Sequence, residues 1–388
     1  MENPKIAHIK PVYLEKTEIW VWEYIRNLTR YDPFIICEVE KNLDLFPFKP
    51  IYKIDPAKGA KKALGSVVRA FIPRHLAVEE AMAQVISRNK PALIHAHFGS
   101  NGVYSAPLSS RFGIPLVTSF YGFDTSYQGL ADKMRKFKLP TDRFYWELAY
   151  KRLWEVGSAF TVTCQLMKDT LVNQLGAPAD KVIPLHLGMN LDKYHLVIKK
   201  PTTAPVILIA NRFVPKKGME YAVSAFAKVL TQYPNATLRI IGDGSEKEKI
   251  TALVNSLGIT DSVKFLGLLG YNDYMAEMQK ADLFLSPSVK VLGDEEGGIN
   301  TTIIEAMAVG THAFATTESG TELIYHEKTG HMVNQRDAND LADKIVSFLK
   351  SPNLWEMLAK SARKHVEEEF DNHKQGKRLE EIYDHVRL

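Results

Sequence analysis

Cysteine and long apolar runs are the two features that this sequence most clearly lacks. Only two cysteines occur in 388 residues, Cys37 and Cys164, far apart and outside any metal-ligand spacing. This argues against a disulfide framework or a cysteine-based zinc site and fits a reducing cytosol. No run approaches the roughly 20 apolar residues that a membrane-spanning helix needs. The first ten residues lack the apolar core of a signal peptide, so we expect a cytoplasmic protein.

Net charge is also low, because 49 Lys and Arg residues face 45 Asp and Glu residues, a formal charge of +4. A charge this small excludes neither nucleic-acid nor membrane contact, and we expect no nucleic-acid partner. Two phosphate-binding signatures are missing as well: the sequence has no G-x-G-x-x-G and no G-x-x-x-x-G-K-[ST]. Dinucleotide binding and ATP hydrolysis therefore lose support.

Short apolar runs alternate with stretches of helical period. Runs rich in β-branched residues that alternate with longer helical segments predict parallel sheets covered by helices on both faces. We expect strands at 5–9, 34–39, 92–98, 115–120, 159–164, 181–187, 206–210, 237–242, 263–267, 282–288 and 312–316. We expect helices at 18–30, 76–89, 165–176, 219–233, 245–258 and 272–281, and an almost entirely helical end from 351 to 388.

The length favours two domains over one core. The strand–helix pattern restarts after residues 188–205, a segment of weak periodicity that collects Lys, Pro and Thr. We place an N-terminal domain at 1–190, a linker at 191–204 and a second domain at 205–368. The C-terminal helix at 369–388 is expected to pack back on the first domain.

Cations stand directly ahead of the helix that follows the strand at 206–210. Arg212, Lys216 and Lys217 precede Gly218 and the helix start. Positive charge opposes the helix dipole at this end. Together with the helix N–H groups, however, it suits a bound phosphate. The alternative is a solvated basic loop.

The segment GDEEGGINTTIIEAMAVG, residues 293–310, joins carboxylates and glycines to a helix start. Thr302 and Glu305 have the spacing of a capping box, in which Thr302 caps the helix and Glu305 bonds back to the cap. This reading leaves the acids and glycines at 294–298 unexplained. Carboxylates near a helix start can accept hydrogen bonds from sugar hydroxyls, and glycines let a ligand approach the backbone.

The second half of the chain carries, in this order, RFVPKKG, LRIIGDGSEKEKI, VKFLGLLG, ADLFLSPS, EGGINTTIIEAMAVG and TESGTELI. These segments closely resemble the family 4 retaining glycosyltransferases of GT-B fold. In the first half, LIHAHFGSNG, IPLVTSFYGFDTS and KVIPLHLGMNLDKY are similar to the subgroup that builds bacterial exopolysaccharides such as colanic acid and amylovoran. The resemblance implies an α/β protein with two doubly wound, Rossmann-like domains facing across a cleft.

The resemblance also implies a nucleotide-diphosphate sugar as donor, bound mostly by the second domain. Arg212 and Lys217 would hold the diphosphate, and Glu305 would receive the ribose hydroxyls. The loop ahead of Glu305 would meet the donor nucleotide and sugar through Glu296, Gly297, Gly298, Ile299, Asn300 and Thr301. The sequence has no D-x-D pair for a metal. Enzymes of this fold neutralise the leaving group with cations and helix dipoles, so we expect no metal and no cofactor.

Two positions depart from the family pattern. The family's first glutamate would fall at 297, where this chain has Gly297, and Glu296 is one residue too early. Either a bulge brings Glu296 to the sugar or the glycine backbone substitutes for a carboxylate. The second departure is Tyr121 in SFYGFD, where many relatives have a histidine that touches the donor sugar. A phenol can donate a hydrogen bond but is no cation near neutral pH.

The catalytic candidates of the first domain are Tyr121, His97 and Asp124. We expect His95 and His97, both on the strand at 92–98, to point to opposite faces. His97 lies nearer the carboxyl end of the strand and is the better candidate for the site, whereas a buried structural role is equally open for His95.

The acceptor side is less defined. The segments 57–75 and 132–140 are basic with interleaved apolar residues, which fits a solvated face or a surface that rests on anionic lipid. We expect a saccharide or lipid-linked saccharide acceptor, presented on the inner face of the plasma membrane. A transferase of the same fold with a small soluble acceptor is the nearest alternative. A catalytically impaired sugar-nucleotide-binding protein is another, suggested by Gly297 and Tyr121; an epimerase of this fold has no support in the loops.

Overall fold

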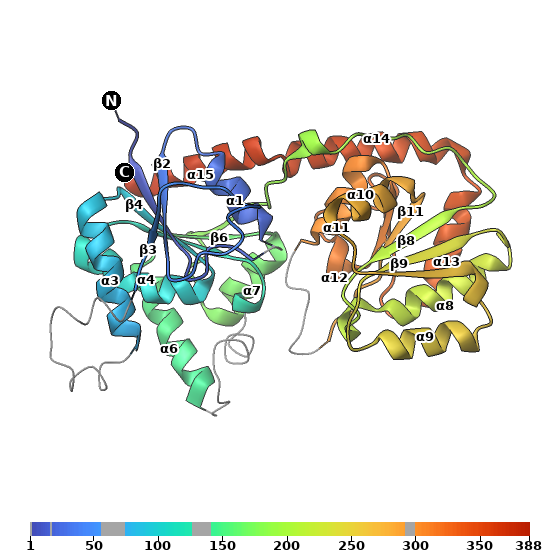
Figure 1. Ribbon diagram of the computed structural model, residues 1–388, viewed down its shortest axis with the longest axis horizontal. Helices are drawn as coiled ribbons and strands as arrows, with labels where there is room; N and C mark the ends of the chain where they lie inside the picture. Colours follow the sequence, from blue (N-terminus) through green and yellow to red (C-terminus); the bar gives the residue numbers. More distant parts are fainter. Residues whose placement is uncertain (1, 16–17, 56–73, 126–140, 292–298) are drawn as a thin grey trace. The chain divides into compact units, whose positions relative to one another are not determined.

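The computed structural model describes residues 2–15, 18–55, 74–125, 141–291 and 299–388 (Figure 1). The chain divides into two compact units. Unit 1 comprises Met1–Asn190 with Asn372–Leu388, and unit 2 comprises Leu191–Asp371.

A seven-stranded sheet of order β3-β2-β1-β4-β5-β6-β7 forms the centre of unit 1. Every neighbouring pair of strands is parallel. The strands are β1 (Lys5–Ile9), β2 (Asp32–Cys37), β3 (Ile51–Lys53), β4 (Leu93–His97), β5 (Leu116–Phe120), β6 (Ala159–Val162) and β7 (Val182–Pro184).

Helices lie on both faces of this sheet (Figure 1). One face carries α3 (Arg74–Asn89), α4 (Gly99–Phe112), α6 (Thr141–Val156) and α7 (Gln165–Leu175). The other face carries α1 (Ile19–Arg26) and α15 (Asn372–Arg387), which contact each other. Under α1 and α15 the sheet changes character along its strands. Ile6, Leu93 and Val117 are apolar core residues, whereas the residues two positions further on are His8, His95 and Ser119. The buried face therefore becomes polar toward the carboxyl ends of the strands.

The last helix, α15, is tied to unit 1 by buried charge. The Glu380 carboxylate accepts hydrogen bonds from the backbone N–H groups of Thr29 (2.5 Å) and Arg30 (2.7 Å) and pairs with the Arg30 guanidinium at 3.0 Å. Asn372 donates to Glu23 at 2.8 Å. Burial alone would raise the pKa of Glu380, but these N–H donors and the Arg30 charge hold the pKa below its usual value.

Unit 2 is built on a six-stranded parallel sheet of order β10-β9-β8-β11-β12-β13. Its strands are β8 (Val206–Ala210), β9 (Thr237–Ile241), β10 (Val263–Gly267), β11 (Leu283–Ser286), β12 (His312–Ala315) and β13 (His331–Met332). On one face lie α8 (Met219–Leu230), α9 (Lys247–Ser256) and α13 (Ala338–Leu349); on the other lie α10 (Tyr271–Lys280), α11 (Thr301–Val309) and α14 (Pro352–Glu369), with the short α12 (Thr317–Gly320) after β12. The fold prediction of two doubly wound parallel sheets is confirmed.

The helix α4 is not evident from its sequence GSNGVYSAPLSSRF, which contains two glycines and Pro107. Tertiary packing explains why it forms a helix. A Cβ on Gly99 would lie 2.1 Å from the Tyr150 hydroxyl, and a Cβ on Gly102 would lie 2.6 Å from Thr118. The glycines allow α4 to approach β5 and α6 closely, and that burial outweighs their low helix propensity.

Candidate functional site

Each sheet reverses its strand order at one point, between β1 and β4 in unit 1 and between β8 and β11 in unit 2. In open parallel sheets such a reversal leaves a crevice outside the carboxyl ends of the two strands, because their connections leave in opposite directions. The loops that follow β1, β4, β8 and β11 are therefore where a ligand is expected. The sequence candidates fall beside these loops.

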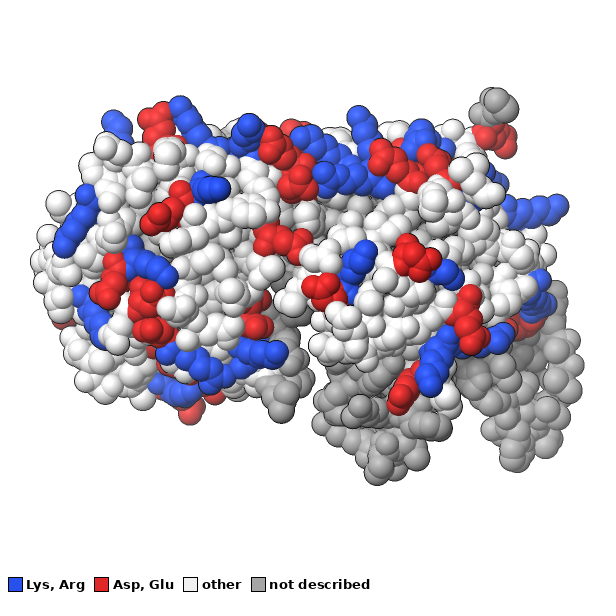
Figure 2. All heavy atoms as spheres, turned by 180° about the vertical axis from the view of Figure 1, so that it is seen from behind, with Lys and Arg blue, Asp and Glu red and all other residues white. Residues whose placement is uncertain are grey.

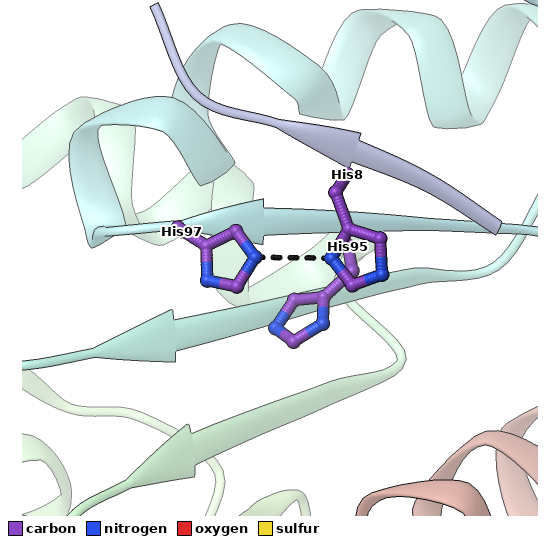
Figure 3. A group of neighbouring side chains, drawn as sticks. All are labelled: His8, His95 and His97. Atoms are coloured by element: carbon purple, nitrogen blue, oxygen red, sulfur yellow. Dashed lines mark hydrogen bonds between the residues drawn. The ribbon is translucent and has the colours of Figure 1, made fainter. Parts of the chain in front are cut away.

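In unit 1 three histidines meet at the reversal point. Figure 3 shows His8 of β1 beside His95 and His97 of β4. His8 and His95 are paired across the two strands, and the rings of His95 and His97 stack with centroids 4.4 Å apart. The expectation that His95 and His97 point to opposite faces is wrong. Side chains alternate with a period of two along a strand, so residues 95 and 97 share a face.

The hydrogen bonds of the three histidines form two chains, which approach each other where Ser119 meets Tyr121. In one chain His8 Nδ1 lies 3.0 Å from His97 Nε2, and His97 Nδ1 lies 2.9 Å from the Tyr121 hydroxyl. In the other, the two nitrogens of His95 bond Tyr383 at 2.6 Å and Ser119 at 2.7 Å. The structure thus brings the predicted pair His97 and Tyr121 together.

Asp124 is fully buried, and in the described part of the chain its carboxylate bonds only backbone groups. One carboxylate oxygen accepts from Gly99 N–H at 2.8 Å, and the other accepts from Tyr121 N–H at 3.1 Å and Gly122 N–H at 2.9 Å. Burial raises the pKa of this carboxyl, and the three N–H donors oppose that shift. Asp124 therefore joins the start of α4 to the loop that carries Tyr121.

All three rings of the cluster are completely buried. Burial lowers the pKa of His95 to about 3 and holds the pKa of His8 and of His97 well below the ordinary value. Neutral imidazoles are metal ligands, and one nitrogen from each ring lies within 4.8 Å of the others. Five of the six ring nitrogens, however, already have hydrogen-bond partners. The geometry fits a hydrogen-bonded cluster better than a metal site.

In unit 2 the cationic loop between β8 and α8 lies against the loop that follows β11. Val289 N–H donates to the Lys216 carbonyl at 2.8 Å. Gly218 has a φ of 58°, and a Cβ there would lie 2.1 Å from the Pro287 carbonyl, so glycine is required at this crossing. Arg212 is exposed, whereas Lys217 is buried with 8% exposure just ahead of α8. Lys217 thus lies directly ahead of α8, and Arg212 lies earlier in the same loop, just after β8.

Glu305, on the first half of α11, is surrounded by phenols. It is 8% exposed. Its carboxylate accepts from Tyr274 at 2.5 Å and more weakly from Tyr194 at 3.4 Å, and Tyr194 bonds Tyr271 at 2.7 Å. Burial raises the pKa of Glu305 to about 7, while the hydroxyl donors act against that shift. An ionised carboxylate has about four lone-pair sites. Tyr274, Tyr194 and Tyr271 all act on it as donors, but Tyr274 is at short distance and Tyr194 is not, so ligand hydroxyls can still be accepted.

The expected capping box is wrong. The N-cap of α11 is Asn300, whose side chain accepts from Thr302 N–H at 3.2 Å and from the Thr302 hydroxyl at 2.7 Å. Asn300 also donates to Ser286 at 3.2 Å, which attaches the helix start to the end of β11. Glu305 is therefore not part of the helix cap, and its carboxylate bonds the tyrosines instead. Ile299 and Thr301 flank the cap; Glu296, Gly297 and Gly298 lie outside the described residues.

Charges of both signs are mixed on the face shown in Figure 2. On α14, for example, Lys360 pairs with Glu356 and Arg363 with Glu367. The predicted basic surfaces at 57–75 and 132–140 lie almost entirely outside the described residues. Among the described helices, none combines the length and apolar character of a membrane span.

Comparison with known proteins agrees with this architecture. Residues 192–365 match the model of the glycosyl transferases group 1, and residues 57–193 match that of Glycosyltransferase Family 4. The chain therefore carries both glycosyltransferase domains, which together span residues 57–365. It is 27% identical over 304 residues, 77% of this chain and 71% of the relative, to the putative colanic acid biosynthesis glycosyltransferase WcaL of Escherichia coli (strain K12).

Two further proteins that are similar to this glycosyltransferase have different names. The N-acetyl-alpha-D-glucosaminyl L-malate synthase of Bacillus anthracis is 28% identical over 322 residues, 81% of this chain and 80% of the relative. The crystal structure of Anabaena Alr3699/HepE in complex with UDP and glucose superimposes with a TM-score of 0.73 at 18% identity, covering 99% of this chain and 100% of that one. The latter establishes the GT-B fold.

Sequence reasoning missed His8, Tyr194, Tyr271 and Tyr274. A local signal existed for His8, since a histidine in the apolar run KIAHI stands one strand away from the other two histidines once the strand order is known. The three tyrosines come from α10 and from the segment after Asn190. No spacing in the sequence links them to Glu305.

Proposed function

We propose that this glycosyltransferase is a retaining enzyme that takes a sugar from a nucleotide-diphosphate donor and works without a metal ion. The observation that carries the proposal is the arrangement at the reversal point of unit 2. There the cationic loop before α8 and the loop before the buried Glu305 follow two neighbouring strands, β8 and β11, and contact each other.

The diphosphate is assigned to Arg212, Lys217 and the first N–H groups of α8. Oriented N–H groups and the helix dipole bind phosphate oxygens, and two cations add charge-assisted bonds. As the bond from sugar to diphosphate breaks, negative charge grows on the leaving oxygen. Fixed positive groups stabilise that charge more in the transition state than in the bound donor, which lowers the barrier.

The ribose is assigned to Glu305. Two neighbouring hydroxyls can donate to the lone pairs that Tyr274 and Tyr194 leave open. Tyr274 holds the carboxylate in one orientation before the ligand arrives, so less freedom is lost on binding. The loop with Glu296, Gly297, Gly298, Ile299, Asn300 and Thr301 is assigned to the donor sugar.

In unit 1, Tyr121 is assigned to the reacting sugar or its acceptor. His97 was also expected to be catalytic, but its two ring nitrogens bond His8 and Tyr121, so we assign it to holding Tyr121. Asp124 was expected to be catalytic, but its oxygens accept three backbone N–H groups. We therefore assign it the role of holding the Tyr121 loop in place.

The acceptor is proposed to be a polysaccharide or lipid-linked saccharide precursor at the cytoplasmic face of an anionic membrane. The likeness to a colanic acid biosynthesis glycosyltransferase supports this choice. A small soluble acceptor is the second candidate, because a relative of similar identity and larger coverage is named an N-acetyl-alpha-D-glucosaminyl L-malate synthase.

A panel of nucleotide sugars tests the proposal. The correct donor should raise the melting temperature, since a ligand at a hundred times its dissociation constant adds about 2.7 kcal/mol of stability. With that donor, NMR of the product should show the anomeric configuration of the donor retained, and EDTA should leave the rate unchanged. Inversion, or a rate restored only by a divalent cation, contradicts the proposed chemistry. Binding without hydrolysis or transfer identifies the impaired binding protein instead.

A further inference from the structure

One nitrogen of the histidine cluster, Nε2 of His8, has no hydrogen-bond partner among the described residues. His8 is completely buried. Its other nitrogen begins the chain that runs through His97 to the hydroxyl of Tyr121, with separations of 3.0 and 2.9 Å. This hydrogen-bond chain therefore ends on one side at the completely buried His8 and on the other side at the hydroxyl of Tyr121, which is only partly buried.

Only two proton arrangements satisfy this chain. Burial keeps His8 and His97 neutral, so each ring carries one N–H. In the outward arrangement, His8 Nδ1–H donates to His97, and His97 Nδ1–H donates to the Tyr121 oxygen. In the inward arrangement, the Tyr121 hydroxyl donates to His97, His97 Nε2–H donates to His8, and His8 carries its proton on Nε2.

The orphan nitrogen distinguishes the two arrangements. The inward arrangement places an N–H donor without an acceptor in the core, and orphaned buried N–H groups are rare in native proteins. The outward arrangement leaves an unused lone pair there, a milder defect of the kind that buried acceptors show more often. The outward arrangement is therefore favoured.

We propose that His8, acting through His97, orients the Tyr121 hydroxyl so that its proton points away from His97 and is donated to an oxygen atom of a bound ligand. His8 and His97 are positioning residues in this account. Tyr121 is the group that contacts the ligand.

Two neighbouring contacts support a fixed donor at this position. Asp124 holds the backbone N–H of Tyr121, so both ends of the tyrosine are restrained. The Ser119 hydroxyl also interacts with Tyr121, but it already bonds His95 at 2.7 Å and Thr161 at 2.5 Å. Burial raises the pKa of Tyr121, and Ser119 acts against that shift, as a hydroxyl does when it donates to the phenol oxygen. The proton of Tyr121 is thus left to a ligand.

The ligand class follows from the chemistry of an O–H donor without charge. It is an acceptor oxygen, such as the oxygen of a sugar hydroxyl. That choice of ligand rests on the proposed function, whereas the direction of the hydrogen-bond chain does not.

The first experiment reads the proton positions directly in the ligand-free protein. Long-range ¹H–¹⁵N spectra of ¹⁵N-histidine-labelled protein distinguish Nδ1–H from Nε2–H rings, and single substitutions of His8 and His97 assign the signals. We expect both residues to be Nδ1–H. If both are Nε2–H, or if either ring is protonated at pH 7, the proposal is wrong whether or not the protein transfers sugar.

The second experiment is a cycle of His8→Phe and Tyr121→Phe with the donor identified above. His8→Phe should lower kcat about three- to tenfold, the range for loss of one neutral hydrogen bond, with donor KM changed less than twofold. In the Tyr121→Phe background, His8→Phe should have no further effect on kcat. His95→Phe is the matched control, because it removes an equally buried ring from the other chain. Additive losses in the cycle, or an equal loss in the control, would show that His8 acts only on packing.

Discussion

In unit 1 a buried imidazole, His97, is bonded to a phenol, Tyr121, whereas in unit 2 a buried carboxylate, Glu305, is bonded to a phenol, Tyr274. Both pairs lie near the point where their sheet reverses its strand order. In each, loss of water disfavours the charged form, so the imidazole becomes a weaker base and the carboxyl a weaker acid. Burial therefore makes the stability of unit 1 fall as pH decreases and the stability of unit 2 fall as pH increases.

The comparison shows what each centre can offer a ligand. A neutral imidazole and phenol supply directed hydrogen bonds but no charge, which suits sugar hydroxyls. A carboxylate that ionises near neutral pH can accept two ribose hydroxyls, and hydroxyl donors favour its ionised form. We propose that the positive charge for the diphosphate comes from Arg212 and Lys217 of unit 2.

The largest expected effect is acid destabilisation through unit 1. Folded His95 stays neutral down to about pH 3, whereas the unfolded ring takes up a proton below about 6.5. Stability is therefore lost as pH falls through this window, by up to about 5 kcal/mol for this ring. His95→Gln should remove that part of the pH dependence.

Urea unfolding at pH 7, 5 and 4 measures this effect. Tryptophan fluorescence reports mainly unit 1, since Trp20, Trp22, Trp146 and Trp154 lie there and only Trp355 lies in unit 2. Identical pH slopes for the variant and the unchanged protein would mean that His95 is not held neutral.

The next effect has the opposite sign and belongs to unit 2. Folded Glu305 keeps its proton up to about pH 7, whereas the unfolded carboxyl ionises near 4.5. Stability should fall as pH rises between these values, by about 3 kcal/mol, and stay level above them. The Glu305→Gln variant should lack this decrease.

Unfolding of Glu305→Gln at pH 5 and 8 checks the second effect, with Glu248→Gln on the exposed side of α9 as control. A Glu305→Gln variant that gains no stability relative to the unchanged protein between these pH values would contradict a buried, proton-holding Glu305.

The third prediction separates the units by what they bind. Arg212→Ala and Lys217→Ala should each weaken nucleoside diphosphate binding about ten- to a hundredfold, because each removes a charge-assisted hydrogen bond. Tyr121→Phe should change it less than twofold. Titration calorimetry measures all three, and Lys228→Ala, at the far end of α8, controls for lost surface charge. An equal loss of affinity in Lys228→Ala would show that the other two lysine and arginine variants weaken binding only because they remove positive charge from the protein.

Sequence reasoning located the parts of the molecule that depend on local pattern. The β-branched runs marked β8, β9 and β11 correctly, because a parallel strand buried on both faces must be apolar throughout. It missed α4, whose glycines only make sense against Tyr150 and Thr118.

The site was less accessible to sequence reasoning, because its contacts join distant segments. Arg212 and Lys217 can be picked out from the sequence because they precede a helix. The partners of Glu305 cannot be picked out in this way, since Tyr194 precedes Glu305 by 111 residues and Tyr274 precedes it by 31. The cap of α11 was misassigned for a similar reason: Asn300 is fixed by Ser286 at the end of β11, a contact that local spacing does not encode.

The central claim is that Glu305 receives the ribose of a nucleotide donor, and one calorimetric cycle tests it most directly. UDP and GDP are titrated first, and the tighter ligand is compared with its 2′,3′-dideoxy form in the unchanged protein and in Glu305→Gln. We predict that the unchanged protein binds the dideoxy ligand about tenfold more weakly, the scale of a hydrogen bond to a charged group. In Glu305→Gln the difference between the two ligands should shrink to less than threefold. The same loss in both proteins would show that the ribose hydroxyls do not bond Glu305 and would contradict the account.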